Sequence, residues 1–551
     1  MTRRNRLFLS AMAPLLMISA AAAEPSAPYD WRGFYLGYHI GGALGLVDVD
    51  NPFGPSIFGD TAHTPGPLAG GQLGYNWQSG RGLLGLEADA SFADMDGTNT
   101  CFAYSGFYVS ANCRAEIDAL GTLAARFGWL PFDGRTLVYG KAGLAWVHSD
   151  IDATPNGGIG RPGTEESGVQ WGWTVGAGIE RAIAPRWTVK AEYGFLAFDD
   201  EGFAAPASEF QPAPPLGAFD PVAGARTDIS TDIHQFKLGM NYALGGVSSQ
   251  AERDAGGKSL SPGAEVPAKG TELKVGVRYV HGWGQFHKDL GLQRRGLAAL
   301  ASRLTYDNDD INGAEAFARL DTSFNLMVKG LVGGASSGGH MNDEDWALQF
   351  PDAFIPYSNT ISGVDNDIDY WLADVGYNLW RGDGYKVTPF IGYSEFRQDM
   401  NGLGCRQLAN PFSDCGVPIP RSVLAIKEDD KWRALRLGAA ADLVIAPRLT
   451  LSGEAAYLPY VDFTGTDDHV LRSLVSPQEG HGTGLQLEAM LSYAVTEALS
   501  VGVGGRYWSM WTTDGTVNFG GTGEIVAMRY AAEQAHFLVQ GSYKFGGGAA
   551  R

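Results

Sequence analysis

Apolar residues alternate with polar residues or glycine in Val169-Gln170-Trp171-Gly172-Trp173-Thr174-Val175-Gly176-Ala177-Gly178-Ile179-Glu180. The large apolar side chains all occupy odd positions, and the charged and amide side chains occupy even ones. Because a β-strand points successive side chains to opposite faces, this period of two predicts a strand with one apolar face. The same period recurs in residues 34–41, 234–242 and 537–545. The chain is therefore predicted to be rich in half-buried strands.

The N-terminus has the features of an export signal. Three arginines precede a short apolar run, Leu7–Ala20, and Ala21-Ala22-Ala23 offers a cleavage site of small residues. This order predicts a signal peptide over residues 1–23. The alternative, a membrane anchor, is disfavoured because the run is shorter than the about 20 residues of a spanning helix. No other stretch of the sequence approaches that length, which excludes a helical membrane protein.

The composition excludes several further classes of protein. The 551 residues include 61 acidic and 41 basic ones, for a formal net charge of −20. Binding to nucleic-acid phosphates needs the opposite balance, so no nucleic-acid partner is expected. Four cysteines in a chain of this length exclude a small disulfide scaffold. The 76 glycines fit the tight turns and the polar inner faces of β-barrels.

An exported chain without a spanning helix can still enter a membrane as a closed β-barrel. A soluble β-sandwich would show the same alternation, but here the apolar face is aromatic at the strand ends, as in membrane girdles. Residues 245–271 lack aromatic residues and are rich in Gly, Ser, Pro and charge, which predicts a flexible periplasmic linker. We therefore expect an all-β chain with two antiparallel, transmembrane, up-and-down barrels over residues 31–244 and 272–546. A single large barrel is the alternative.

The four cysteines form two local pairs. Cys101 and Cys113 are 12 residues apart, and Cys405 and Cys415 are 10 apart. In an oxidising compartment, each pair is predicted to close a disulfide that stiffens an extracellular loop. No metal site is expected, because no histidine or further cysteine stands at ligand spacing.

Several motifs of the first barrel are shared with a known family. Trp31–Gly37, Gly74–Trp77, Gly85–Asp89 and the closing Lys237–Tyr242 resemble the eight-stranded outer-membrane immunogenic barrel proteins of Gram-negative bacteria. The resemblance covers about residues 30–244 and implies an eight-stranded barrel without enzymatic activity.

The second barrel holds two clusters that could support chemistry. In Gly338–Trp346, Asp343 and Asp345 lie on the same face of a strand and are expected to face the lumen. Two carboxylates held close together raise the pKa of one, so that they can share a proton or position a water molecule.

The second cluster is Thr466–His469, in which Asp467 can orient His469 and raise its basicity. Residues 449–457 place their apolar side chains at odd positions, which would turn Asp467 outward. A bulge or bend at Pro459 or Gly465 must therefore change the register. Either cluster by itself also fits a solvated acidic loop.

Together these clusters resemble the omptins, ten-stranded outer-membrane endopeptidases. Further similarity extends through Ser302–Tyr306, Gly392-Tyr393 and Tyr543–Phe545. The resemblance implies that Asp343 and Asp345 face Asp467 and His469 across an extracellular cleft, where they activate a water molecule that attacks a peptide bond. It implies no metal or organic cofactor.

A third cluster is predicted to face the lipid. Tyr393, Glu395 and Arg397 share the parity of apolar residues in their strand, and Lys431 and Arg433 share that of theirs. Outward charges are tolerated near the membrane interface, where arginine can bind lipopolysaccharide phosphates with two hydrogen bonds. In omptins Tyr-x-Glu-x-Arg forms a lipid A site, so the resemblance implies lipopolysaccharide binding by Tyr393, Glu395 and Arg397, with Lys431 as the next partner. An ordinary strand end emerging into solvent is the alternative.

One feature departs from the omptin pattern. Omptins that cut beside basic residues carry an acidic residue two positions before the dyad aspartate, where Gly465 stands here, and another on the first strand. Residues 285–297 contain no glutamate and instead include Gln293-Arg294-Arg295. The sequence therefore does not predict a preference for cutting after Arg or Lys.

From the sequence we expect an outer-membrane endopeptidase of a Gram-negative bacterium, with its active site facing outside and peptides or proteins as substrates. Lipopolysaccharide is the expected activator. The alternative is a non-enzymatic surface barrel or adhesin. A diffusion porin is a weaker alternative, because barrels of eight to ten strands fill their interiors with side chains.

Overall fold

The computed structural model describes residues 29–546, apart from residues 55, 104–109, 132–133, 157–161, 211–219, 245–269, 293–295, 351–352, 383 and 410–414. The predicted signal peptide and all but the last two residues of the predicted linker lie outside the described residues. No helix in the described part of the chain is long and apolar enough to cross a membrane.

The first barrel is a closed antiparallel sheet of eight strands in the order β1-β10-β7-β6-β5-β4-β3-β2. A short hairpin, β8–β9, stands between β7 and β10 in the chain. The strands are β1 (Gly33–Val49), β2 (Thr61–Ser79), β3 (Gly82–Cys101), β4 (Ala111–Trp129), β5 (Thr136–Pro155), β6 (Thr164–Ala182), β7 (Trp187–Ala204), β8 (Ser208–Phe210), β9 (Asp220–Val222) and β10 (Arg226–Ala243).

The second barrel has ten long strands, closed by the pairing of β14 with β16, and a short strand β15 at its rim. The strands are β11 (Glu272–Leu292), β12 (Gly296–Asp321), β13 (Leu326–Phe350), β14 (Ala353–Tyr377), β15 (Trp380–Gly382), β16 (Tyr385–Ala409), β17 (Ile419–Ala446), β18 (Leu449–His469), β19 (Leu474–Ala494), β20 (Leu499–Asn518) and β21 (Ile525–Gly546). Two 3-10 turns, η2 (Val470–Arg472) and η3 (Phe519–Gly521), follow β18 and β20. The predicted fold class, two antiparallel barrels of eight and ten strands, is confirmed.

The alternation seen in the sequence separates the outer and inner faces of the barrels. In β6, Trp171 is 66% exposed and Trp173 is 48% exposed, whereas Glu180 on the opposite face is buried. In β21, Phe537 and Val539 lie outside and Gln540 lies in the lumen. The outward-pointing aromatic and aliphatic residues of these strands therefore belong to the lipid-facing surface, as the parity of the sequence predicts.

Charged side chains fill the lumen of the first barrel. Lys237 Nζ lies 2.8 Å from Asp89 Oδ1, Lys141 Nζ lies 2.7 Å from Glu192 Oε1, and Arg126 Nη2 lies 2.7 Å from Glu180 Oε2. Each of these groups is buried. Opposite charges that pair across so narrow a barrel leave it a packed interior rather than an open pore.

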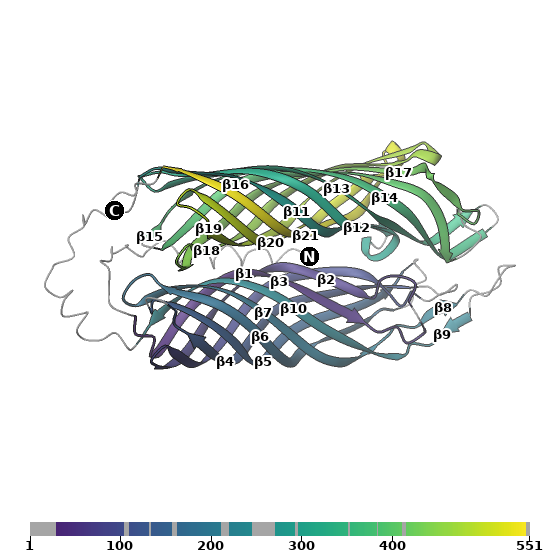
Figure 1. Cartoon of the computed structure of the whole chain (residues 1–551). Coiled ribbons are helices and arrows are strands. Elements are labelled where there is room, and N and C mark those ends of the chain that lie inside the picture. Colours follow the sequence, from purple (N-terminus) through teal and green to yellow (C-terminus); the bar gives the residue numbers. More distant parts are fainter. Residues whose placement is uncertain are drawn as a thin grey trace.

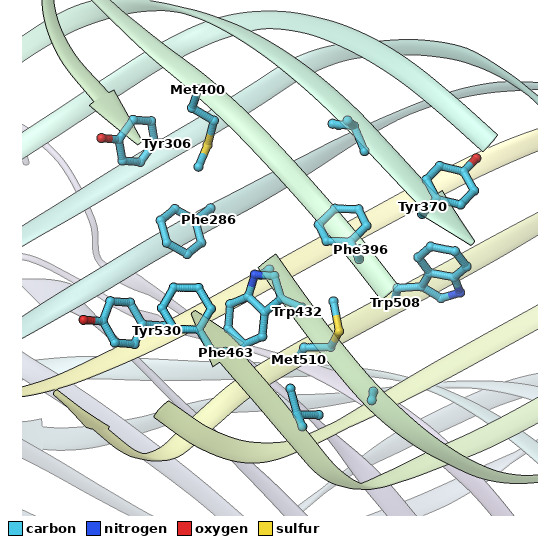
Figure 2. Packing of buried hydrophobic residues seen from close by; sticks show 14 of the residues in the cluster. Phe286, Tyr306, Tyr370, Phe396, Met400, Trp432, Phe463, Trp508, Met510 and Tyr530 are labelled. Carbon is cyan, nitrogen blue, oxygen red and sulfur yellow. The ribbon is translucent and has the colours of Figure 1, made fainter. Parts of the chain in front are cut away.

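The lumen of the second barrel is filled differently at its two ends. Its middle and distal part holds a packed apolar cluster, in which the rings of Phe463 and Tyr530 are 4.2 Å apart and those of Trp432 and Phe463 are 4.4 Å apart (Figure 2). Nearer the other end, Arg506 pairs with Glu315 at 2.8 Å. The lumen is therefore closed beneath its distal mouth.

The two barrels lie side by side (Figure 1). We call proximal the end at which β10 ends and β11 begins, and distal the opposite end, which carries the β8–β9 hairpin. At the proximal end Tyr385 Oη donates a hydrogen bond to the carbonyl of Ile183. Farther along, Leu238 of the first barrel packs with Ala455 of the second. Apolar side chains that would otherwise face lipid thus pack against each other.

Candidate active site

The two aspartates of the first cluster lie on β13 near the distal end of the second barrel. Asp343 pairs with Leu304 of β12, and Asp345 pairs with Ser302. The pairing of β13 with β14 runs without a shift from Leu326 to Trp346, so the alternation is unbroken. Val332 is exposed on the outer face, and the odd-numbered aspartates therefore face the lumen as expected.

The Asp–His pair lies on β18, across the lumen. The pairing of β18 with β19 shifts between Leu458 and Val461, around Pro459, so that Tyr460 points outward and Val461 is buried. This irregularity confirms that the register changes at Pro459. It turns Asp467 inward, with His469 Nε2 3.2 Å from Asp467 Oδ2.

The four residues lie beyond the lipid-facing part of the barrel. The hydrocarbon band of a barrel is about 25 Å tall, which is about ten residues per strand. Exposed Trp283 and Tyr460 mark its distal aromatic belt. Asp467 follows Tyr460 by seven positions on β18, and Asp343 lies 17 positions from the start of β13. The site therefore stands at the distal mouth of the lumen.

The electrostatics of these residues are coupled. Burial raises the pKa of Asp343 to about 8, and the neighbouring carboxylate of Asp345 adds to the shift, while His469 opposes it. The pKa of His469 is raised by Asp467, against the effect of burial. The structure thus brings all four predicted residues to one end of the lumen, with one carboxyl poised to hold a proton near neutral pH.

The sequence reasoning missed a lysine at the centre of the site. Lys288 of β11 is fully buried, and its Nζ lies 2.9 Å from Asp467 Oδ2. It also forms an ion pair with Glu428 of β17. Lys288 holds the pKa of Asp467 well below its usual range. Nothing near Lys288 in the sequence marks it, because its partners lie 140 or more residues away.

Other missed residues surround the dyad. Asp430 stands opposite Gly465 in the register of β17 and β18, and a Cβ at Gly465 would lie 2.5 Å from Asp430 Oδ1. The neighbouring strand therefore supplies an acidic group next to the position where omptins carry their own. Arg472 of η2 lowers the pKa of both aspartates of β13, although burial dominates their shifts. Gln293, Arg294 and Arg295 lie outside the described residues.

The predicted lipid-binding cluster lies on the outer face of β16 and β17. Arg397 Nε donates to Glu395 Oε1 at 2.7 Å, and Arg433 Nε lies 3.2 Å from Glu395 Oε2. Lys431 pairs with Arg397 in the register, and Tyr393 is 39% exposed. Glu395 therefore holds two guanidinium groups on the outer surface, with the ammonium on the same face.

Both predicted disulfides are present. Cys101 of β3 bonds Cys113 of β4, and Cys405 of β16 bonds Cys415, with Cα atoms 5.7 and 5.8 Å apart. Among the described residues, one group of acids has ligand atoms close enough to hold a metal ion, namely Glu87, Asp89 and Glu192. Lysine ammonium groups already occupy the space between these carboxylates, which fits a network of ion pairs rather than a metal.

Comparisons with known proteins match the two barrels separately. Residues 13–243 match the model of the outer membrane protein β-barrel domain, and residues 303–521 match that of the omptin family.

Several outer-membrane proteins match the first of these regions. The chain is similar to the 31 kDa outer-membrane immunogenic protein of Brucella melitensis, with 33% identity over 196 residues that cover 33% of this chain and 79% of the relative. It is also similar to the 22 kDa outer membrane protein of Rhizobium leguminosarum, with 30% identity over 185 residues that cover 33% of this chain and 70% of the relative.

Among solved structures, the outer membrane protease OmpT from Escherichia coli is 12% identical, with a TM-score of 0.41, covering 52% of this chain and 99% of that one. The match of residues 303–521 to the omptin family supports the fold of an outer-membrane protease for the second barrel. The chain is therefore an outer-membrane protein of Gram-negative bacteria that belongs to the outer-membrane immunogenic barrel family through its first barrel and contains an omptin family domain over residues 303–521 of its second.

Proposed function

We propose that the second barrel is an endopeptidase that hydrolyses peptide bonds at the cell surface with a water molecule activated by Asp467 and His469. The observation that carries this proposal is the placement of the His469–Asp467 pair and the two lumenal aspartates of β13 at the same distal mouth. Membership of the omptin family supports the broader assignment as a protease. Long loops of such barrels lie outside the cell, which supports an outward orientation of this mouth.

The arrangement can carry out hydrolysis with a balanced set of proton transfers. Neutral His469 removes a proton from water, and the oxygen attacks the carbonyl carbon of the peptide bond. Asp467, kept ionised by Lys288, stabilises the imidazolium that forms. The Asp343–Asp345 pair shares one proton and holds the water and the carbonyl oxygen by hydrogen bonds. When the C–N bond breaks, the imidazolium returns its proton to the leaving amine.

Cleavage of an unbiased peptide library by the refolded full-length protein, in vesicles that contain lipopolysaccharide, tests this proposal. Replacing a general base costs about 10²–10⁴-fold in rate, so His469→Ala should reduce kcat/KM by that factor. His281→Ala is the matched control, because His281 also lies beside an aspartate but on the outer face of β11. Equal rates for His469→Ala and the wild type would exclude the proposed mechanism.

We also propose that the cluster around Glu395 binds the phosphates of lipopolysaccharide and that this binding activates the site. Arg397 is 53% exposed and belongs to a surface that faces lipid, where an anionic headgroup is the available partner. Lys431 and Arg433 add positive charge on the same face. Tyr393 would pack against the lipid beside them.

Activity as a function of lipopolysaccharide content tests this second proposal. Arg397→Ala should raise the amount of lipopolysaccharide needed for half-maximal activity about tenfold or more, because it removes a charge-assisted contact. Arg32→Ala is the matched control, since Arg32 also binds a carboxylate two residues away but lies on the first barrel. An unchanged dose response for Arg397→Ala would favour the solvent-exposed strand end.

A further inference from the structure

A buried polar contact joins the distal ends of the two barrels. Arg303 of β12 points away from the lumen, opposite in parity to Ser302 and Leu304, and is nevertheless only 1% exposed. Its guanidinium forms an ion pair with Asp289 of β11, with Arg303 Nε 2.6 Å from Asp289 Oδ1. Buried charges of this kind need further polar partners to offset their loss of water.

The first barrel supplies those partners. Arg303 Nη1 donates to Thr100 Oγ1 at 3.1 Å, and Nη2 donates to Thr98 Oγ1 at 3.0 Å and to Asn112 Oδ1 at 2.8 Å. Thr98 in turn donates to Asp289. Thr98, Thr100 and Asn112 lie at the distal ends of β3 and β4, which are joined by the Cys101–Cys113 disulfide.

The same edge of the first barrel contacts β13 at the candidate site. Thr100 Oγ1 donates to Glu344 Oε2 at 2.6 Å, and Trp346 Nε1 donates to Ser110 Oγ at 2.8 Å. Trp346 also packs with Ala103 and is 2% exposed. Leu300 N–H donates to Asn156 Oδ1 of the first barrel, which extends the contact along β12.

This contact acts at the residues that carry the proposed chemistry. Because side chains alternate along a strand, Glu344 faces the first barrel while Asp343 and Asp345 on either side of it face the lumen. Ser302, the cross-strand partner of Asp345, likewise adjoins Arg303. A shift of about 1 Å in a reacting group can cost about 10²-fold in rate. Contact of the first barrel with this outer face therefore affects the positions of the lumenal aspartates.

We propose that the first barrel is a positioning partner of the second. The edge of the first barrel that is formed by β3 and β4 binds the outer side of β12 and β13, and we call this the interbarrel contact. It fixes the aspartate pair opposite the Asp–His dyad. The positioning role rests on the proposed peptidase function, whereas the interbarrel contact itself does not. Thr98, Thr100 and Asn112 are positioning residues, since none of them reaches the lumen of the second barrel.

The test uses the full chain and changes only the first barrel, with the combined substitutions Thr98→Val, Thr100→Val and Asn112→Ala. Hydroxyl-radical footprinting of Trp346 measures the interbarrel contact, and peptide cleavage measures the positioning of the aspartate pair. We expect the oxidation of Trp346 to rise several-fold, and kcat to fall about tenfold or more with KM nearly unchanged. A matched variant that carries Thr100→Ser instead of Thr100→Val keeps a hydroxyl at this position and should recover part of both changes.

Ser91→Ala is the control for a general loss of stability, because Ser91 bonds His39 inside the first barrel and should change neither readout. Continued protection of Trp346 in the combined variant would overturn the proposed role of Thr98, Thr100 and Asn112 in the interbarrel contact. Exposure of Trp346 with an unchanged kcat would overturn the positioning role. A wild-type protein that cleaves no peptide while Trp346 is protected would overturn the peptidase function and the positioning role together. The same result would still support the interbarrel contact.

Discussion

Replacement of Lys288 by methionine should displace the pH dependence of the second barrel rather than abolish its activity. Lys288 is fully buried between Glu428 and Asp467. Methionine keeps the length and apolar stem of the side chain and removes the charge. Without the ammonium, Glu428 can take up a proton, and His469 remains as an ionic partner of Asp467.

The size of the effect follows from the geometry. Lys288 Nζ and His469 Nε2 lie 2.9 and 3.2 Å from the same oxygen, Asp467 Oδ2, so they are at most about 6 Å apart. At an effective dielectric constant of about 20, two like charges at that distance repel by about 3 kcal/mol, or about two pKa units. Since His469 is partly exposed, solvent screening reduces this to about one to two units.

The sign is fixed by the charge of the lysine. Lys288 lowers the pKa of His469, so its removal raises that pKa and leaves less neutral imidazole at pH 7. We expect kcat/KM at pH 7 to fall about 10–100-fold and to recover toward the wild-type value as the pH rises. The assay is the pH profile of kcat/KM for a cleaved peptide, with circular dichroism to verify the fold. An equal loss at every pH would refute the electrostatic role.

Three further predictions concern other parts of the second barrel. Because the pKa of Asp343 is raised to about 8, loss of its proton should lower kcat/KM above about pH 8, and this limb should vanish from the residual activity of Asp343→Asn. Arg506→Met should destabilise the barrel by about 3–5 kcal/mol in urea unfolding, since Glu315 and Glu488 both lose a guanidinium and are left to share that of Arg278; a loss under 1 kcal/mol would contradict the pairing. Phe463→Ala, in the cluster of Figure 2, should cost about 3–5 kcal/mol in the same measurement, and an unchanged midpoint would show that the lumen is not closely packed.

Much of the site could be predicted because parity is a local property. The alternation of apolar residues identified the inner face of β13 and hence the orientation of Asp343 and Asp345. The conflict between the parity of residues 449–457 and an inward Asp467 required a change of register, which the structure places at Pro459. A proline cannot donate to the sheet ladder, so it marks such a position in the sequence itself.

The partners of these residues could not be predicted in the same way. Lys288 looks like any lysine in an alternating strand, and its contact with Asp467 exists only because closure of the barrel brings β11 and β18 to opposite sides of one narrow lumen. Arg303 and Thr100 are 203 residues apart in the chain and belong to different barrels.

The order of residues along the chain therefore specifies the strands, the face on which each side chain lies and the two short disulfides, because each depends on neighbours within a few residues. Tertiary structure specifies which lumenal charges meet and that Glu344 of β13 touches the first barrel. Those contacts depend on strand tilt, on barrel closure and on the packing of two outer surfaces, which no local pattern encodes.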